Sequence, residues 1–254
     1  MILRRVIDHF KKQEWTAIAL DFLIVVIGVF VGMQVTNWNE ARVARKNERA
    51  FVVMVRDTMA TNADDIRSYI DLLDSDLKYG SRAADALEKK EPCADDCWPR
   101  IIDLFLASQW IDTRGDRTAF NEIQRTGLPR DAGLKAVIIR YYGLQDQLAS
   151  ISAQLPEYRA LARSIIPARA QLYYWSNCFR AEGQRQYHDE KCASPLSKEE
   201  ERSVYESLQA DPQLGRALNY WLSTVSIIKV GLATQLKETD VALAAIDRHL
   251  ETLQ

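Results

Sequence analysis

Apolar positions divide the chain into two regions with different patterns. From Trp15 to Trp38 most positions are apolar, and the only formal charge is Asp21. After this run, apolar residues recur at steps of three and four, the spacing of one helix face. Ten Gly and seven Pro in 254 residues leave few turn positions. The pattern therefore predicts long helices rather than many short strands.

The first periodic stretch predicts a stalk helix that continues directly from the apolar run. Beyond that run, no helix breaker occurs before Gly80 and Pro92. The stripe is weak where it passes through Thr58 and Asn62, and it then becomes heptad-like. Its inward positions are predicted to be Ile66, Ile70, Leu73, Leu77, Gly80, Ala84 and Leu87.

The second periodic stretch predicts a long C-terminal helix that opens at Asp211-Pro212. An extra residue between Leu232 and Leu236 predicts a stutter in its seam. Because this helix matches the stalk in length, we expect the two to pack antiparallel in one all-α bundle. An intermolecular coiled coil is the alternative. The inward positions are predicted to be Leu214, Leu218, Trp221, Val225, Ile228, Leu232, Leu236, Thr239, Leu243, Ile246 and Leu250.

Capping signals predict shorter helices between the two long ones. A helix is expected from Pro99 to about Ile111. Asp116 and Asp131 are predicted to begin two more, the first ending at Gly127 and the second near Leu155. Ser197-Lys198-Glu199-Glu200 has the spacing of a capping box.

The apolar run is long enough to cross a bilayer. A helix from Trp15 to Trp38 measures about 35 Å, against a hydrocarbon core of roughly 30 Å. The two Trp rings would lie at the interfaces. The sequence thus predicts a short cytoplasmic segment (1–14), one transmembrane helix (15–38) and a helical extracytoplasmic domain (39–254). A buried soluble helix and a cleaved signal peptide fit the length and flanks less well.

Cysteines, rather than flanking charges, indicate the orientation. Four basic residues precede the apolar run and four follow it within residues 39–49, so the positive-inside rule gives no answer. The four cysteines border polar loops, as in oxidised, exported proteins. Three pairings are possible, and we favour Cys93 with Cys97 and Cys178 with Cys192 because each pair closes a short loop. Free thiols, or zinc bound with His188, are the alternatives, although the spacing is unlike that of structural zinc sites.

One face of the predicted membrane helix carries both its acid and its glycines. Asp21, Val25, Gly28 and Gly32 lie on one side of a helical wheel. A Gly-x-x-x-Gly spacing lets two membrane helices approach closely, so we expect this face to contact a partner helix. Alternatively, Asp21 carries protons, in an arrangement that resembles the stator subunits of flagella and of the TonB system.

Two blocks of the sequence resemble a known family. "DFLIVVIGVFVGMQVTNWNE", with its acid, Ile27-Gly28, Gln34 and Asn37-Trp38-Asn39-Glu40, is similar to the anchor of a family of uncharacterised bacterial single-pass membrane proteins, a domain of unknown function. Glu is the commoner acid there. "RTAFNEIQRTGLPRDAGLKAVIIRYY" resembles the family's second block. The resemblance covers under a fifth of the chain and implies an anchored helical domain without a known activity.

No recognisable catalytic or cofactor-binding motif accompanies this architecture. The net charge of -2 and scattered basic residues argue against nucleic acid. None of the three His has a nucleophile or acid at a catalytic spacing. We therefore expect no enzyme activity, cofactor, metal or small-molecule substrate. The predicted function is that of an inner-membrane subunit, mostly periplasmic, that associates with itself or with a larger membrane complex.

Overall fold

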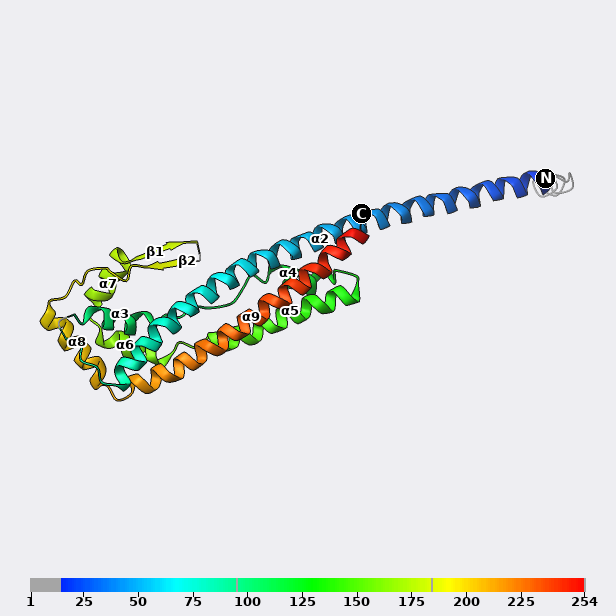
Figure 1. Ribbon diagram of the computed structural model, residues 1–254. Helices are drawn as coiled ribbons and strands as arrows, with labels where there is room; N and C mark the ends of the chain where they lie inside the picture. The colour runs from blue at the N-terminus through cyan, green and yellow to red at the C-terminus, as the bar shows by residue number, and fades with distance from the viewer. Residues whose placement is uncertain (1–14, 95, 184, 254) are drawn as a thin grey trace, which may run out of the picture. The chain divides into compact units, whose positions relative to one another are not determined.

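The computed structural model describes residues 15–94, 96–183 and 185–253. The predicted cytoplasmic segment, 1–14, lies outside the described residues, as does the side chain of Trp15. The described part is all-α apart from one short hairpin (Figure 1). Its elements are α2 (Trp15–Glu88), α3 (Trp98–Leu106), α4 (Thr118–Thr126), α5 (Ala132–Ser152), α6 (Glu157–Ile165), α7 (Ala168–Asn177), β1 (Phe179–Glu182), β2 (Arg185–His188), α8 (Lys198–Ala210) and α9 (Leu214–Thr252).

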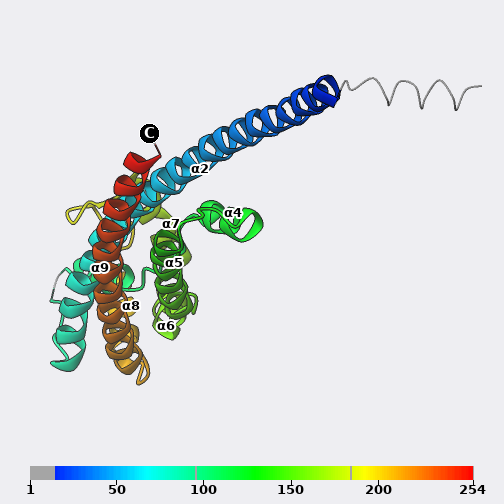
Figure 2. The same cartoon turned by 90° about the vertical axis from the view of Figure 1, so that its right-hand side faces the viewer.

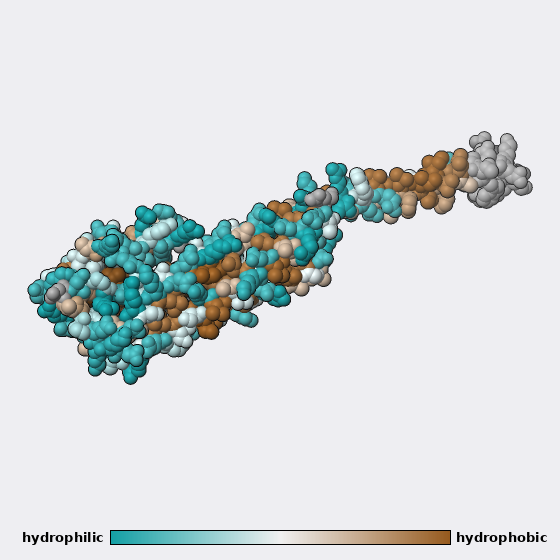
Figure 3. All heavy atoms as spheres, in the orientation of Figure 1, coloured by the Kyte–Doolittle hydropathy of each residue, from teal (hydrophilic) through white to brown (hydrophobic). Residues whose placement is uncertain are grey.

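The chain divides into two compact units at Phe51 and Val52. The first unit consists of the N-terminal part of α2, and its side chains from Ile18 to Val43 are all exposed. Figure 3 shows apolar residues, in brown, along the visible side of this helix. Within the described residues, α2 is the one helix long and apolar enough to cross a membrane. The predicted apolar span is therefore present as a continuous helix.

The second unit is a bundle built on the rest of α2 and on α9. Arg56 Nε lies 2.7 Å from Asp247 Oδ1 near one end of the pair, and Lys229 is bonded to Asp74 farther along. The numbering rises along one helix as it falls along the other, so the two helices run antiparallel within one chain (Figures 1 and 2). The predicted antiparallel bundle is confirmed.

The inward seam of α2 differs in part from the prediction. Ile66, Leu73 and Gly80 are buried as expected. The other predicted inward positions are only half-buried: Ile70, Leu77, Ala84 and Leu87. The seam also continues without weakening past Asn62. Ala63, Leu72, Tyr79 and Ala86 are buried beside it. The central line of the seam consists of Val52, Val55, Met59, Asn62, Ile66, Tyr69, Leu73, Asp76, Gly80 and Ala83, all of them buried. Steps of three and four alternate throughout this list, as in a regular heptad.

The predicted stutter in the C-terminal helix is wrong. Gln235, 1% exposed, occupies the inward position after Leu232, and Leu236 is only half-buried. Leu243 is likewise half-buried, because Ala242 takes its place. The buried positions of α9 are Leu214, Leu218, Trp221, Val225, Ile228, Leu232, Gln235, Thr239, Ala242 and Ile246. The steps alternate between four and three without interruption, because polar and small residues fill inward positions that a hydrophobicity pattern misses.

Several predicted caps are present. Asp131 Oδ1 accepts from Leu134 N at 2.6 Å, and Ser197 with Glu200 forms the reciprocal capping box. Gly127 ends α4 in the left-handed conformation, with φ of 72°. Asp116 accepts from Thr118 N at 2.8 Å, one residue ahead of the N-cap position.

The predicted ends of two helices are too late, since α3 ends at Leu106 rather than near Ile111 and α5 at Ser152 rather than near Leu155. Tertiary hydrogen bonds lie at both helix ends. Trp221 Nε1 donates to Ala107 O at 2.9 Å, and Trp110 Nε1 donates to Ser152 O at 2.7 Å.

Candidate functional site

The predicted contact face lies in the first unit, on the apolar part of α2. Asp21 and Val25 are exposed, and Val25 shows 62% of its surface. A Cβ added at Gly28 or Gly32 would meet nothing of this chain within 4 Å. Thr36 Oγ1 donates to Gly32 O at 3.0 Å, so this hydroxyl is satisfied within the helix. The face is open to another helix, and a contact across it stays a prediction.

The two disulfides have the pairing favoured from the sequence. Cys93 is bonded to Cys97, and Cys178 to Cys192, with Cα atoms 4.8 and 5.5 Å apart. All four cysteines of the chain are thereby used. The alternatives of free thiols and of a zinc site built on these cysteines are therefore wrong for this structure. Cys97 is the N-cap of α3 and Cys178 the C-cap of α7, so each bridge fixes a helix end.

The second disulfide closes a β-hairpin where the sequence suggested only a polar loop. Strands β1 and β2 pair antiparallel, with Phe179 opposite His188. Gly183 lies in the turn with φ of 61°, a conformation that suits glycine. His188 Nδ1 lies 3.1 Å from Tyr174 OH. Burial lowers the pKa of His188, so its imidazole is neutral at pH 7.

Glu190, just after the hairpin, ties it to α2. Its Oε1 accepts from Lys78 Nζ at 2.5 Å and from Tyr79 OH at 3.2 Å. The hydrogen bond from Lys78 lowers the pKa of Glu190. Burial, with the charge of Glu190, raises the pKa of Tyr79 to about 12. The carboxylate and the neutral phenol therefore form a stable clasp at neutral pH, and neither is poised to transfer protons.

An ion pair between a half-exposed arginine and a buried aspartate lies next to this clasp. Arg82 of α2 binds Asp103 of α3 through Nε and Nη2. Burial raises the pKa of Asp103, while the hydrogen bond from Arg82 opposes that shift. Arg82 also lies over the Tyr79 ring, 4.9 Å from its centroid. These contacts hold α3 against α2. The described residues around them include no pair of a nucleophile and a base.

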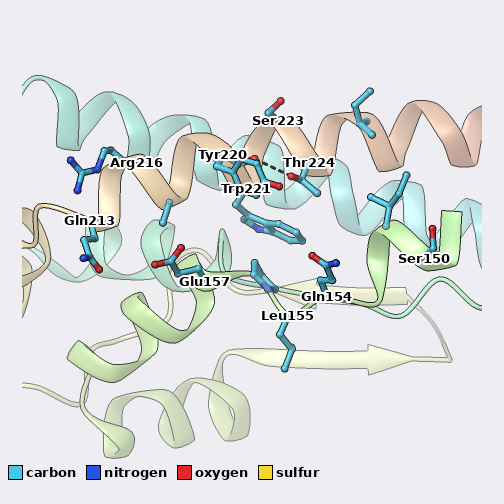
Figure 4. A pocket seen from close by; sticks show the side chains of 14 residues that line it. Ser150, Gln154, Leu155, Glu157, Gln213, Arg216, Tyr220, Trp221, Ser223 and Thr224 are labelled. Carbon is cyan, nitrogen blue, oxygen red and sulfur yellow. Dashed lines mark hydrogen bonds between the residues drawn. The ribbon is translucent and has the colours of Figure 1, made fainter. Parts of the chain in front are cut away.

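A groove of about 800 Å³ lies beside α9. Its walls come from the end of α5, from Pro156 and Glu157, and from α9 between Gln213 and Ile227. Figure 4 shows Trp221 projecting from α9, with Gln154 and Leu155 on the opposite side. Glu157 and Arg216 are its charged lining residues. The lining carries no arrangement of nucleophile, base and oxyanion donor.

Comparisons with protein-family models, curated proteins and solved structures found no match to this chain. The resemblance of its N-terminal segment to a bacterial membrane-protein family therefore stays a prediction. Within the described residues, no group of three or more His, Cys, Asp or Glu is placed to hold a metal ion.

Sequence reasoning missed the hairpin, its clasp and the groove. The hairpin strands are four residues long and mostly charged or polar, so they give no alternating signal. Glu190 meets Lys78 across 112 positions of the chain, and such a contact has no local signature. The groove did leave a signal, because Tyr220, Ile227 and Val230 form a second apolar stripe on α9 outside the predicted seam.

Proposed function

We propose that this chain is a membrane-anchored, non-enzymatic interaction subunit of the bacterial inner membrane. Its apolar α2 segment spans the bilayer once and associates with another membrane helix, either of its own copy or of a larger complex. The disulfide-linked helical domain lies in the periplasm and presents its surface there. The observation that carries the proposal is the open helix face formed by Asp21, Val25, Gly28 and Gly32.

An acid inside an apolar span needs a partner. Asp21 lies several residues inside the span, and its short side chain does not reach water as a Lys or Arg side chain does. A hydrogen bond across a helix contact would satisfy its oxygens, and Gly28 and Gly32 on the same face would let the partner backbone come close. The two disulfides support export to an oxidising compartment. The family resemblance supports a bacterial membrane.

The membrane contact can be tested by filling the glycine face. Gly28→Leu places a bulky side chain on that face, so association in a membrane-helix assay should be lost. Val26→Leu, on the opposite side of the helix, is the matched control and should associate normally. Asp21→Asn keeps a hydrogen-bonding group and should retain association, whereas Asp21→Leu should weaken it.

The same variants separate this proposal from a proton carrier. If Asp21 carries protons, Asp21→Asn leaves assembly intact and abolishes function as completely as Asp21→Leu does. If Gly28→Leu and both Asp21 variants associate like the unchanged chain, then the face is not a contact surface and the proposed association is wrong.

A further inference from the structure

Helix α9 carries an exposed apolar stripe in addition to its buried seam. Tyr220, Ile227 and Val230 expose 77%, 58% and 64% of their surfaces. Tyr220 and Ile227 are seven residues apart, and Val230 follows three residues later, as do the a and d positions of a heptad. Thr234 is exposed and continues the seven-residue spacing. The stripe thus has the repeat of a helix-pairing surface.

Three hydroxyls within this stretch are satisfied by their own helix. Thr224 Oγ1 donates to Tyr220 O at 3.1 Å, a bond drawn in Figure 4. Ser226 Oγ donates to Leu222 O at 2.9 Å, and Thr234 Oγ1 donates to Val230 O at 3.0 Å. Hydroxyls bonded back to the helix need no water. The face can therefore be covered without leaving these hydroxyls unpaired.

The stripe is also free of formal charge. Between Arg216 and Lys237 the only charged residue is Lys229, and its ammonium is bonded to Asp74 on α2. In a chain that is 27% charged, a neutral exposed face of this length is unusual. When a surface meets its own copy in register, identical residues face each other, so any charge on it would repel its equivalent. A neutral face fits this requirement.

The stripe and the adjoining groove together expose a large apolar area. Ile151 and Leu155, across the groove from α9, expose another 42% and 67% of their surfaces. Together these five side chains expose on the order of several hundred Å² of apolar surface, the size of the largest patch on a typical monomer, and such patches are often functional. A specific interface buries roughly 800 Å² on each partner, so this patch would form the apolar centre of a larger contact.

We propose that the neutral face of α9 from Asn219 to Thr234 pairs with the same face of a second copy of this chain. The relative direction of the two α9 helices rests on the membrane anchor of the proposed function. The chain enters the bundle at Val52, and this end also holds Asp247, which pairs with Arg56. The membrane segment connects to the bundle at this end, and the proposal takes this end to face the membrane in both copies. The two α9 helices therefore run parallel, with Ile227 facing Ile227 of the second copy.

Single introduced cysteines test this geometry in the full chain. All four native cysteines form disulfides, so Ile227→Cys or Thr234→Cys supplies one free thiol on the proposed seam. Oxidation in membranes should then join each variant to its own copy, because facing positions of a parallel pair lie within about 7 Å between Cα atoms. Leu172→Cys is the matched control, since Leu172 of α7 is 67% exposed and lies outside the stripe. It should stay monomeric.

A like-charge variant adds a second measurement. Ile227→Glu, combined with Thr234→Cys, places two carboxylates opposite each other and should reduce cross-linking about tenfold or more, the loss expected when one interface anchor is removed. Leu172→Glu in the same background should leave cross-linking unchanged.

The outcomes distinguish the interface from the anchor. Cross-linking at 227 and 234 but not at 172 supports the parallel pair. If the chain stays in carbonate-washed membranes but does not cross-link, the α9 interface alone is overturned. The same holds if position 172 cross-links equally, or if the cross-linked partner is a chain of another mass. Release of the chain by the carbonate wash overturns the proposed anchor and, with it, the parallel arrangement.

Discussion

Asp76 is the residue whose environment is least expected from its chemistry. It occupies an inward position of α2 and is only 1% exposed. Its Oδ2 has no hydrogen-bond partner among the described residues. Burial raises the pKa of Asp76 well above its usual range, and the charges of Arg159 and Arg163 oppose that shift only in part. The folded chain thus favours the neutral carboxylic acid.

The raised pKa predicts a stability that falls as pH rises. The folded chain binds this proton more tightly than the unfolded chain does. The stability that Asp76 gains from its proton is therefore complete below the unfolded pKa of about 3.9. It is lost as pH rises through the folded pKa. Asp76→Asn removes the cost of ionising a buried acid and should raise stability at pH 7 by about 1–3 kcal/mol.

Thermal unfolding of the detergent-solubilised chain at pH 4 and pH 7 measures this effect. The difference between Asp76→Asn and the unchanged chain should shrink at the lower pH. Asp74→Asn is the matched control, since Asp74 is half-exposed in its ion pair with Lys229. A lower melting temperature for Asp76→Asn at pH 7 would show instead that the ionised carboxylate stabilises the bundle through Arg159 and Arg163.

At the scale of the element, α9 offers two leucines that differ in burial. Leu232 is 1% exposed on the inward seam, and Leu236 lies half-buried beside it. Leu232→Ala should lower the free energy of unfolding by about 2–5 kcal/mol, as expected when a core leucine leaves a cavity. Leu236→Ala should lower the free energy of unfolding by clearly less. Chemical denaturation of both variants makes the comparison, and equal losses would contradict the seam seen in the structure.

The sequence predicted both long helices because their apolar residues repeat over many turns, and it predicted their antiparallel packing because the two helices match in length. It did not predict which residue faces inward where the seam is polar. Asn62 is 1% exposed and exchanges two hydrogen bonds with the backbone of Asp116. Gln235 donates to Tyr141 O at 3.3 Å. These partners come from distant segments, so hydropathy alone assigned the inward position to Leu236 instead.

At the scale of the whole molecule, the two disulfides stabilise one end of the bundle. Trp98 follows Cys97, and its Nε1 donates to Cys192 O at 3.0 Å, which links the two bridged segments. Lys198 Nζ, 3.1 Å from Asp96 Oδ1, adds an ion pair to the loop between Cys93 and Cys97. The clasp depends on long-range contacts, and the short polar strands of the hairpin give no alternating pattern, so the sequence showed only a polar loop. The candidate membrane face, in contrast, was visible in the sequence because it needs only the helical repeat of one segment.

The disulfides also give the sharpest test of where this domain lies. If it is periplasmic, a membrane-impermeant thiol reagent added to intact cells should label the native cysteines only after an impermeant reductant has opened the bridges. Cys93 and Cys192 are half-buried, whereas Cys97 and Cys178 are buried. Cys93 and Cys192 should therefore be labelled before the other two.

A cysteine on the other side of the membrane completes this test. His9→Cys lies before the apolar span and should be labelled only after lysis, since a single-pass helix places it in the cytoplasm. Labelling of the native cysteines without reduction would show that the bridges are absent in cells. Labelling of these cysteines only after lysis would place the domain in the cytoplasm, and the disulfides would then no longer support export. Because reduction and lysis are varied separately, the experiment tests oxidation and topology independently of any partner.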